Sequence, residues 1–159
     1  MAWGGATVKI GVRSLCEVPY QHILVEYDGT SDGDAALLAA RDLAVRDGAK
    51  LTVVAVVALE QTMRRVTRLP MLTGVWNDVL LDRARADLER AEHLLDTPAE
   101  FTVLFGPQTK ALAAGAEEFG CDAIMLPARR SRWIAGLLRR DRSRRLSRLA
   151  GGVPVLRPR

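Results

Sequence analysis

Cysteine, histidine and aromatic residues are scarce in this chain of 159 residues, which has two cysteines, two histidines and 5% aromatic residues. Cys16 and Cys121 form neither a metal-ligand spacing nor a disulfide framework, and this favours a cytosolic setting. His22 and His93 have no sequence neighbour that would indicate a catalytic triad or a metal site. The sequence therefore offers no catalytic residue and no metal ligand, and we expect a protein that is not an enzyme.

Long apolar runs are also absent, since none approaches the about 18 residues that a membrane helix needs. The first residues, MAWGGATVKIGVRS, lack the basic start and apolar stretch of a signal peptide, so we expect a cytoplasmic protein with no membrane span. Hydrophobic residues make up 48% of the chain and charged residues 26%, as in ordinary globular domains. A chain of this length can bury a core without a metal or a disulfide.

Charge is divided unevenly along the chain, although the net charge is only +4. Residues 1–127 hold 12 basic and 18 acidic side chains, whereas residues 128–159 hold 11 arginines and one acid, Asp141. A basic segment of this kind is typical either of a solvated face or of a surface that binds an anionic partner. A polyanion binder acting through residues 129–148 is therefore one hypothesis for the function. Nucleic acid is disfavoured as the polyanion, because the segment has one aromatic residue and no recognition motif.

Strand and helix patterns alternate along the chain. The predicted strands cover 22–28, 51–57, 100–105, 121–126 and 153–156, and the predicted helices cover 31–47, 77–95, 109–119 and 141–150. Such alternation predicts an α/β three-layer sandwich around a mainly parallel sheet. Residues 60–76 form a long connection, and residues 7–12 alternate in a way that would add an edge strand.

Local signals support the first helix and the second strand. Ser31 followed by Asp34 predicts a capping box, and Gly48 predicts the end of the helix. Between them we expect an apolar stripe that packs on the sheet; it comprises Leu37, Leu38, Ala44 and Val45. The continuous β-branched run over 51–57 is typical of a strand buried on both faces, as in parallel sheets.

Four segments in this order resemble the universal stress protein family: ILVEYDGTSDGDAALLAARDLA, LTVVAVV, CDAIMLPARRSR and SRRLSRLAGGVPVL. The resemblance covers residues 21–157, so we expect a domain over 21–159 that follows an N-terminal arm, 1–20. It implies a Rossmann-like five-stranded parallel sheet of order 3-2-1-4-5 and a role in stress tolerance. It also implies a homodimer that pairs through the last strand, with Val153, Val155 and Leu156 as the exposed edge.

Many members of that family bind ATP between the first and fourth strands, where ligands of open α/β sheets lie. The matching positions here are Asp28, Gly29 and Thr30 after the first strand, Val57 at the end of the second, and Pro127, Arg129 and Arg130 after the fourth. The family's phosphate loop is G-x-x-G, nine residues, then G-[ST]. When Gly136, Arg145 and Ala150 are matched to their counterparts in the family, Pro127 and Arg130 fall at the first two glycines of this loop. Arg140-Asp141 falls at the final pair. Backbone amides can then no longer approach a phosphate closely, so we expect the ATP site to be lost.

The sequence is consistent with two hypotheses for the altered cleft. Glu26 and Asp28 point to the same side of the first strand, and Arg129 or Arg130 would pair with them and fill the cleft from within. In the alternative, a cradle of arginine side chains, Arg140 among them, binds the phosphates of ATP, and the protein is a nucleotide sensor. We favour a non-catalytic stress-response domain without a cofactor that acts by binding a protein partner.

Overall fold

The computed structural model describes residues 18–58, 73–128 and 135–158, and the side chains of these residues apart from 73–76 and 135–141. Strands and helices alternate as the sequence predicts. Their bounds are β1 His22–Glu26, α1 Ser31–Asp47, β2 Lys50–Val57, α3 Thr73–Leu94, β3 Glu100–Phe105, α4 Gln108–Glu118, β4 Ala123–Met125, α5 Ala135–Leu149 and β5 Val155–Leu156.

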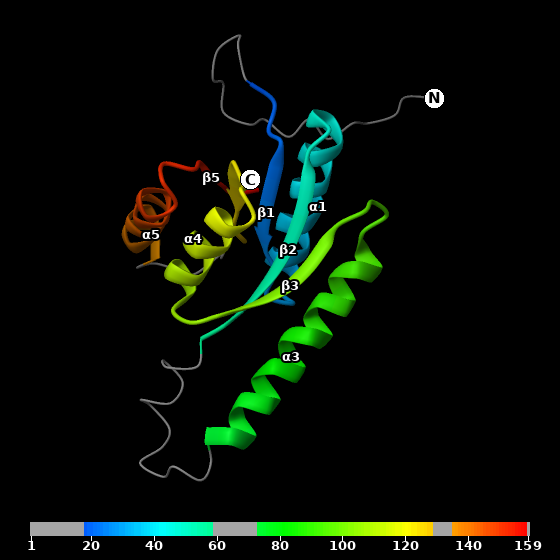
Figure 1. Ribbon diagram of the computed structural model, residues 1–159, viewed down its shortest axis with the longest axis vertical. Helices are drawn as coiled ribbons and strands as arrows, with labels where there is room; N and C mark the ends of the chain where they lie inside the picture. Colours follow the sequence, from blue (N-terminus) through cyan, green and yellow to red (C-terminus); the bar gives the residue numbers. More distant parts are fainter. Residues whose placement is uncertain (1–17, 59–72, 129–134, 159) are drawn as a thin grey trace.

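All five strands are parallel and form one sheet of order β3-β2-β1-β4-β5, which confirms the predicted fold. Helices α1 and α3 cover one face of the sheet, and α4 and α5 cover the other (Figure 1). The chain leaves β1 toward β2 on one side and returns to β4 on the other. The strand order therefore reverses at β1, and its carboxyl end is the point where ligands bind in folds of this type.

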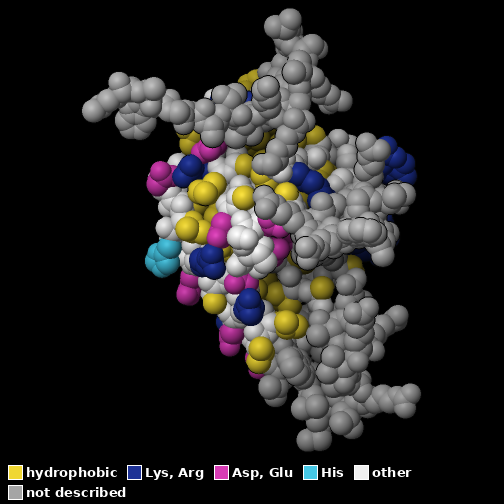
Figure 2. Space-filling view, turned by 180° about the vertical axis from the view of Figure 1, so that it is seen from behind, with side chains coloured by type: hydrophobic (Ala, Val, Ile, Leu, Met, Phe, Trp, Pro, Cys, Tyr) yellow, Lys and Arg dark blue, Asp and Glu magenta, His cyan; other side chains and the backbone are white. Residues whose placement is uncertain are grey.

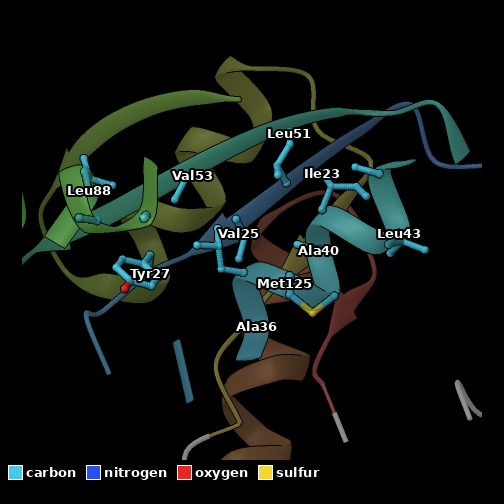
Figure 3. Packing of buried hydrophobic residues seen from close by; sticks show 14 of the residues in the cluster. Ile23, Val25, Tyr27, Ala36, Ala40, Leu43, Leu51, Val53, Leu88 and Met125 are labelled. Atoms are coloured by element: carbon cyan, nitrogen blue, oxygen red, sulfur yellow. The ribbon is translucent and has the colours of Figure 1, made fainter. Parts of the chain in front are cut away.

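Alternate residues of β1 enter two separate cores. Ile23 and Val25 of β1, and Tyr27 directly after it, pack under α1 and α3 together with the odd-numbered residues of β2 (Figure 3). Leu24 faces α4 and α5 instead, in a second core that includes Leu112. By the same alternation, Glu26 points to the α4 and α5 side, so a carboxylate follows Leu24 into an apolar layer.

The caps of α1 correct one expectation and confirm another. The N-cap is Thr30 rather than Ser31, because the Thr30 hydroxyl accepts a hydrogen bond of 3.1 Å from the Gly33 amide. Gly48 ends the helix at φ +68°, as predicted. Val45 is 64% exposed and does not belong to the buried stripe. That stripe comprises Ala36, Leu37, Ala40, Leu43 and Ala44.

Several element boundaries differ from those expected. Strand β1 ends at Glu26 and not at residue 28, and β4 is only three residues long. Helix α3 begins at Thr73 and α5 at Ala135, both earlier than their apolar periodicity predicts. The predicted strand over 7–12 lies outside the described residues. Across the described part of the chain, none of the helices combines the length and apolar character needed to span a bilayer.

Candidate functional site

A cavity of about 250 Å³ lies where β1 and β2 end, against the middle of α3. The ends of β1 and β2 contribute Glu26, Tyr27 and Asp28 and residues 55–58, and α4 contributes Gln108. Four α3 residues at helical spacing complete the wall: Leu80, Arg83, Ala84 and Asp87. Figure 1 shows that the amino-terminal half of α3 extends beyond this edge of the sheet. We call this space the β1–α3 cavity.

Glu26 is the last residue of β1 and is only 3% exposed. Its Oε1 accepts a hydrogen bond from the side-chain amide of Gln108, the first residue of α4. Its Oε2 lies 3.8 Å from a guanidinium nitrogen of Arg142 on α5. A buried carboxylate is stable only with such partners, so side chains from three elements meet where the strand order reverses.

Two more carboxylates lie at the amino-terminal end of α1. Asp28 Oδ1 accepts hydrogen bonds from the Thr30 amide (3.2 Å) and the Thr30 hydroxyl (2.5 Å). Gly29 has φ +69°, and the Asp87 carboxylate occupies the space where a Cβ at this position would be. The partial positive charge of the helix end, which elsewhere attracts anionic ligands, is therefore already offset by carboxylates of the protein.

A hydrogen-bonded network holds α3 against the β1–α1 turn. The Tyr27 hydroxyl donates to Asp34 Oδ1 (2.6 Å), and Arg90 donates to Asp34 Oδ2 (2.6 Å). Burial, followed by the bond to Asp34, raises the pKa of Tyr27 above its ordinary value. Arg83 lies 3.6 Å from Asp87 one turn along α3. These contacts fix the wall of the cavity.

The residues that the sequence singled out fall into three groups. Asp28 and Val57 line the cavity, and Gly29 and Thr30 form the turn beside it. Pro127 is buried after β4. Arg129, Arg130 and Arg140, which were the expected partners of Glu26 or of a phosphate, lie outside the described residues or side chains.

Sequence reasoning identified Glu26 but missed its partners Gln108 and Arg142. It also missed the role of Asp87. The position of Asp87 next to the apolar stripe of α3, which includes Ala84 and Leu88, could have indicated that this carboxylate lies close to the sheet. For Gln108 the signal was its place at the start of a helix that follows a parallel strand, because such helices begin at the carboxyl edge of the sheet.

The other reactive side chains of the described residues do not indicate a second functional site. In that part of the chain, no group of three or more histidine, cysteine or acidic side chains is placed to hold a metal ion. Cys121 is buried, and burial raises the pKa of its thiol to about 11, so the thiolate that a nucleophile requires is disfavoured. His22 forms a 2.8 Å hydrogen bond with Thr52 at the opposite edge of the sheet.

Comparison with known proteins agrees with the fold. The model of the universal stress protein family matches residues 19–156. A universal stress protein-family structure from Burkholderia pseudomallei is similar at 22% identity, with 89% of this chain and 97% of that chain covered and a TM-score of 0.66. No curated protein matches the sequence.

Two similar structures are described as complexes. A universal stress protein in complex with cAMP shares 22% identity, with 87% of this chain and 96% of that chain covered and a TM-score of 0.61. The universal stress protein from Archaeoglobus fulgidus in complex with dAMP shares 18% identity, with 89% and 99% covered and a TM-score of 0.59. At these identities the likeness shows a shared fold.

Proposed function

Because the chain belongs to the universal stress protein family, we propose that it is a non-catalytic stress-response domain that acts by binding a partner and whose cleft no longer accepts ATP. The observation that carries the proposal is the burial of Glu26 at the point where the strand order reverses. There the carboxylate is bonded to Gln108 and faces Arg142. In this proposal the Glu26 carboxylate occupies the space that a phosphate would need and pairs with Arg142, the cation that would bind it.

Charge supports the same conclusion. A phosphate entering the β1–α3 cavity would face the carboxylates of Glu26, Asp28 and Asp87, with Arg83 as the one cationic side chain among the cavity residues that the structure describes. Like charges at short range in a partly desolvated site repel each other by several kcal/mol, on the order of 332/(εr) with an effective ε of about 20. Binding of a triphosphate would have to overcome this repulsion.

Thermal unfolding with and without Mg-ATP tests the proposal. A ligand at 100 times its Kd adds about 2.7 kcal/mol of stability, which is readily seen as a rise in Tm. We expect no nucleotide-specific rise at millimolar ATP for the native chain. Glu26→Ala opens the space beside Arg142 and should introduce such a rise, whereas Glu26→Gln keeps the space filled and should not. A clear rise for the native chain would refute the proposal.

A nucleotide sensor is the second candidate function. Two proteins of the same fold are described with cAMP and dAMP, and the β1–α3 cavity lies at the position where such sheets bind ligands. This candidate requires arginine side chains to replace the lost glycine loop. It predicts ATP binding by the native chain that Arg140→Ala abolishes.

We further propose that the protein forms a homodimer through β5 and that residues 21–159 form the family domain after an N-terminal arm. Val155 and Leu156 lie in β5 and Val153 just before it, at the outer edge of the sheet. An edge strand offers unpaired backbone groups to a second copy. Light scattering at working concentration tests this, and a monomer would refute it.

The exposed arginines of α5, Arg144, Arg145 and Arg148, favour a polyanion as a further candidate partner on that side of the molecule. By contrast, Figure 2 shows acidic and basic side chains interspersed on the side turned away from the viewer in Figure 1. Binding to duplex DNA would weaken with salt, and each lost phosphate contact would reduce the slope by about 0.9.

A further inference from the structure

We propose that the outer edge of β3 is a pairing surface, to which β3 of a second copy of this chain adds antiparallel about a two-fold axis at Val103. The sheets of the two copies would then continue into one. Among the residues that the structure describes, no strand pairs with this edge. The inference is independent of the cleft and of pairing through β5, which lies at the opposite edge of the sheet.

Strand β3 lacks the features that protect an edge strand from other chains. Natural edges are blunted by short length, lysine, proline or bulges. β3 has six residues, EFTVLF, and its one charged residue, Glu100, stands at its start. It pairs with β2 in unbroken register, and all of its residues keep some exposure, whereas most of β2 is buried. An apolar edge of this length is a template for another strand.

The backbone of β3 presents alternate residues to the outer edge. The Gly106 amide donates a hydrogen bond of 3.0 Å to the Val57 carbonyl, so residue 106 faces β2. The amide and carbonyl of one residue point to the same side of a strand, and successive residues alternate. Phe101, Val103 and Phe105 therefore present both groups to the outer edge. Helix α3 packs more on β2 than on β3, which favours an uncovered outer edge.

The sequence of β3 is complementary to itself in antiparallel pairing. With Val103 at the two-fold axis, Val103 faces its own copy, and Phe101 of each chain faces Phe105 of the other. All three present both backbone groups outward, so each of these pairs is joined by two hydrogen bonds. Glu100 would lie opposite Gly106 of the other copy, so no like charges meet within the strand pair.

The same register accounts for an exposed aromatic ring. Phe101 and Val103 are partly buried against the core under α1 and α3. Odd-numbered side chains share this face of β3, so Phe105 lies there too, and it is 55% exposed at the end of the strand. In the pair, Phe101 of the other copy would lie beside it as an aromatic cross-strand neighbour. A second copy would thus remove apolar surface that a single chain leaves in water.

Sedimentation velocity of the full-length protein over a range of concentrations tests the inference. We expect the native chain to associate, and Val103→Pro to raise the Kd of the β3 contact at least roughly tenfold. The reason is that the two-fold axis makes one lost amide remove two hydrogen bonds. The ladder to β2 should survive, because the amide of residue 103 points outward and proline is tolerated at such edge positions. Far-UV circular dichroism of the variant checks that the fold is kept.

A second variant keeps the test decisive if the proline variant does not fold. Phe105→Lys leaves the backbone unchanged and places a charge beside Phe101 of the other copy, so it should weaken association by a similar factor. Val45→Lys is the matched control, because it adds the same charge at a 64% exposed apolar residue of α1. Association of the control should equal that of the native chain.

The outcomes separate β3 pairing from β5 pairing. The inference is supported if each folded β3 variant loses one step of association, from tetramer to dimer or from dimer to monomer, and the control does not. It is overturned if the native chain is a monomer, or if a folded β3 variant associates like the native chain. A dimer that neither β3 variant weakens leaves pairing through β5 standing. An equal loss in the control would show that net charge sets association, and would also overturn the inference.

Discussion

The ion pair between Glu26 and Arg142 is a quantitative test of the closed cleft. At 3.8 Å and an effective ε of about 20, the two charges attract each other by about 4 kcal/mol before the cost of their desolvation. The Arg142 side chain is 29% exposed and the Glu26 side chain 4%, so water weakens the pair from one side only. Loss of one partner from a fully buried pair costs about 3–5 kcal/mol. For this half-screened pair we expect a coupling energy of about 1–2 kcal/mol.

A double-mutant cycle measures this coupling directly. Glu26→Gln keeps the shape of the side chain without its charge, and Arg142→Met keeps most of the aliphatic stem without the guanidinium group. The free energy of unfolding is obtained by urea denaturation of the four proteins. The matched control is the pair formed by Arg85 and Asp82, which are 63% and 76% exposed at 3.7 Å and should couple by no more than about 0.5 kcal/mol. If the Glu26–Arg142 coupling does not exceed that of the control, the pair does not hold the cleft closed and our reasoning is refuted.

Three further predictions concern the stability of the fold. Burial raises the pKa of Cys121 from about 9 to about 11, so stability should fall as the pH rises through this interval. The raised pKa of Tyr27 adds to the fall, so in a denaturation series Cys121→Ala should reduce the fall and not abolish it. The hydrogen bond from Arg46 lowers the pKa of Asp47, so the ionised carboxylate stabilises the fold above about pH 4 and this stabilisation is lost as the pH decreases further. Asp47→Asn should therefore make the free energy of unfolding less dependent on pH in the acid range. Gly29→Ala should destabilise more than Gly48→Ala in thermal unfolding. Both positions have φ near +69°, so an alanine at either incurs about 1–2 kcal/mol of strain. A carboxylate packs only against the first position, and equal losses of stability would contradict this reasoning.

The order of the elements along the chain could be predicted because it depends on local patterns, whereas the position of the cleft followed from the family resemblance. The β-branched run of β2 has a continuous apolar character that only a strand covered on both faces retains, and the structure buries it there. The strand order came from the resemblance, and it placed Asp28 and Val57 at the cavity that they line. Boundaries were predicted less well. Thr30 and Ser31 are both good N-cap residues, and only the hydrogen bond to Gly33 decides between them.

The partners of Glu26 could not be predicted from local patterns. Gln108 lies 82 residues away from Glu26 along the chain, and Arg142 reaches it from a different helix. With eleven arginines in the last 32 residues, the sequence could not indicate which one approaches the carboxylate. That choice depends on how α4 and α5 pack on the sheet, because their registers set which side chains point to the end of β1.

The same arginine explains why the closed cleft and a phosphate site exclude each other. A phosphate that took Arg142 as its cation would leave the Glu26 carboxylate buried beside a second anion and without its cationic contact to Arg142. The cost of breaking the pair, at most the 3–5 kcal/mol of a fully buried one, would then be subtracted from any phosphate affinity. The buried carboxylate therefore opposes binding of a phosphate at this end of β1.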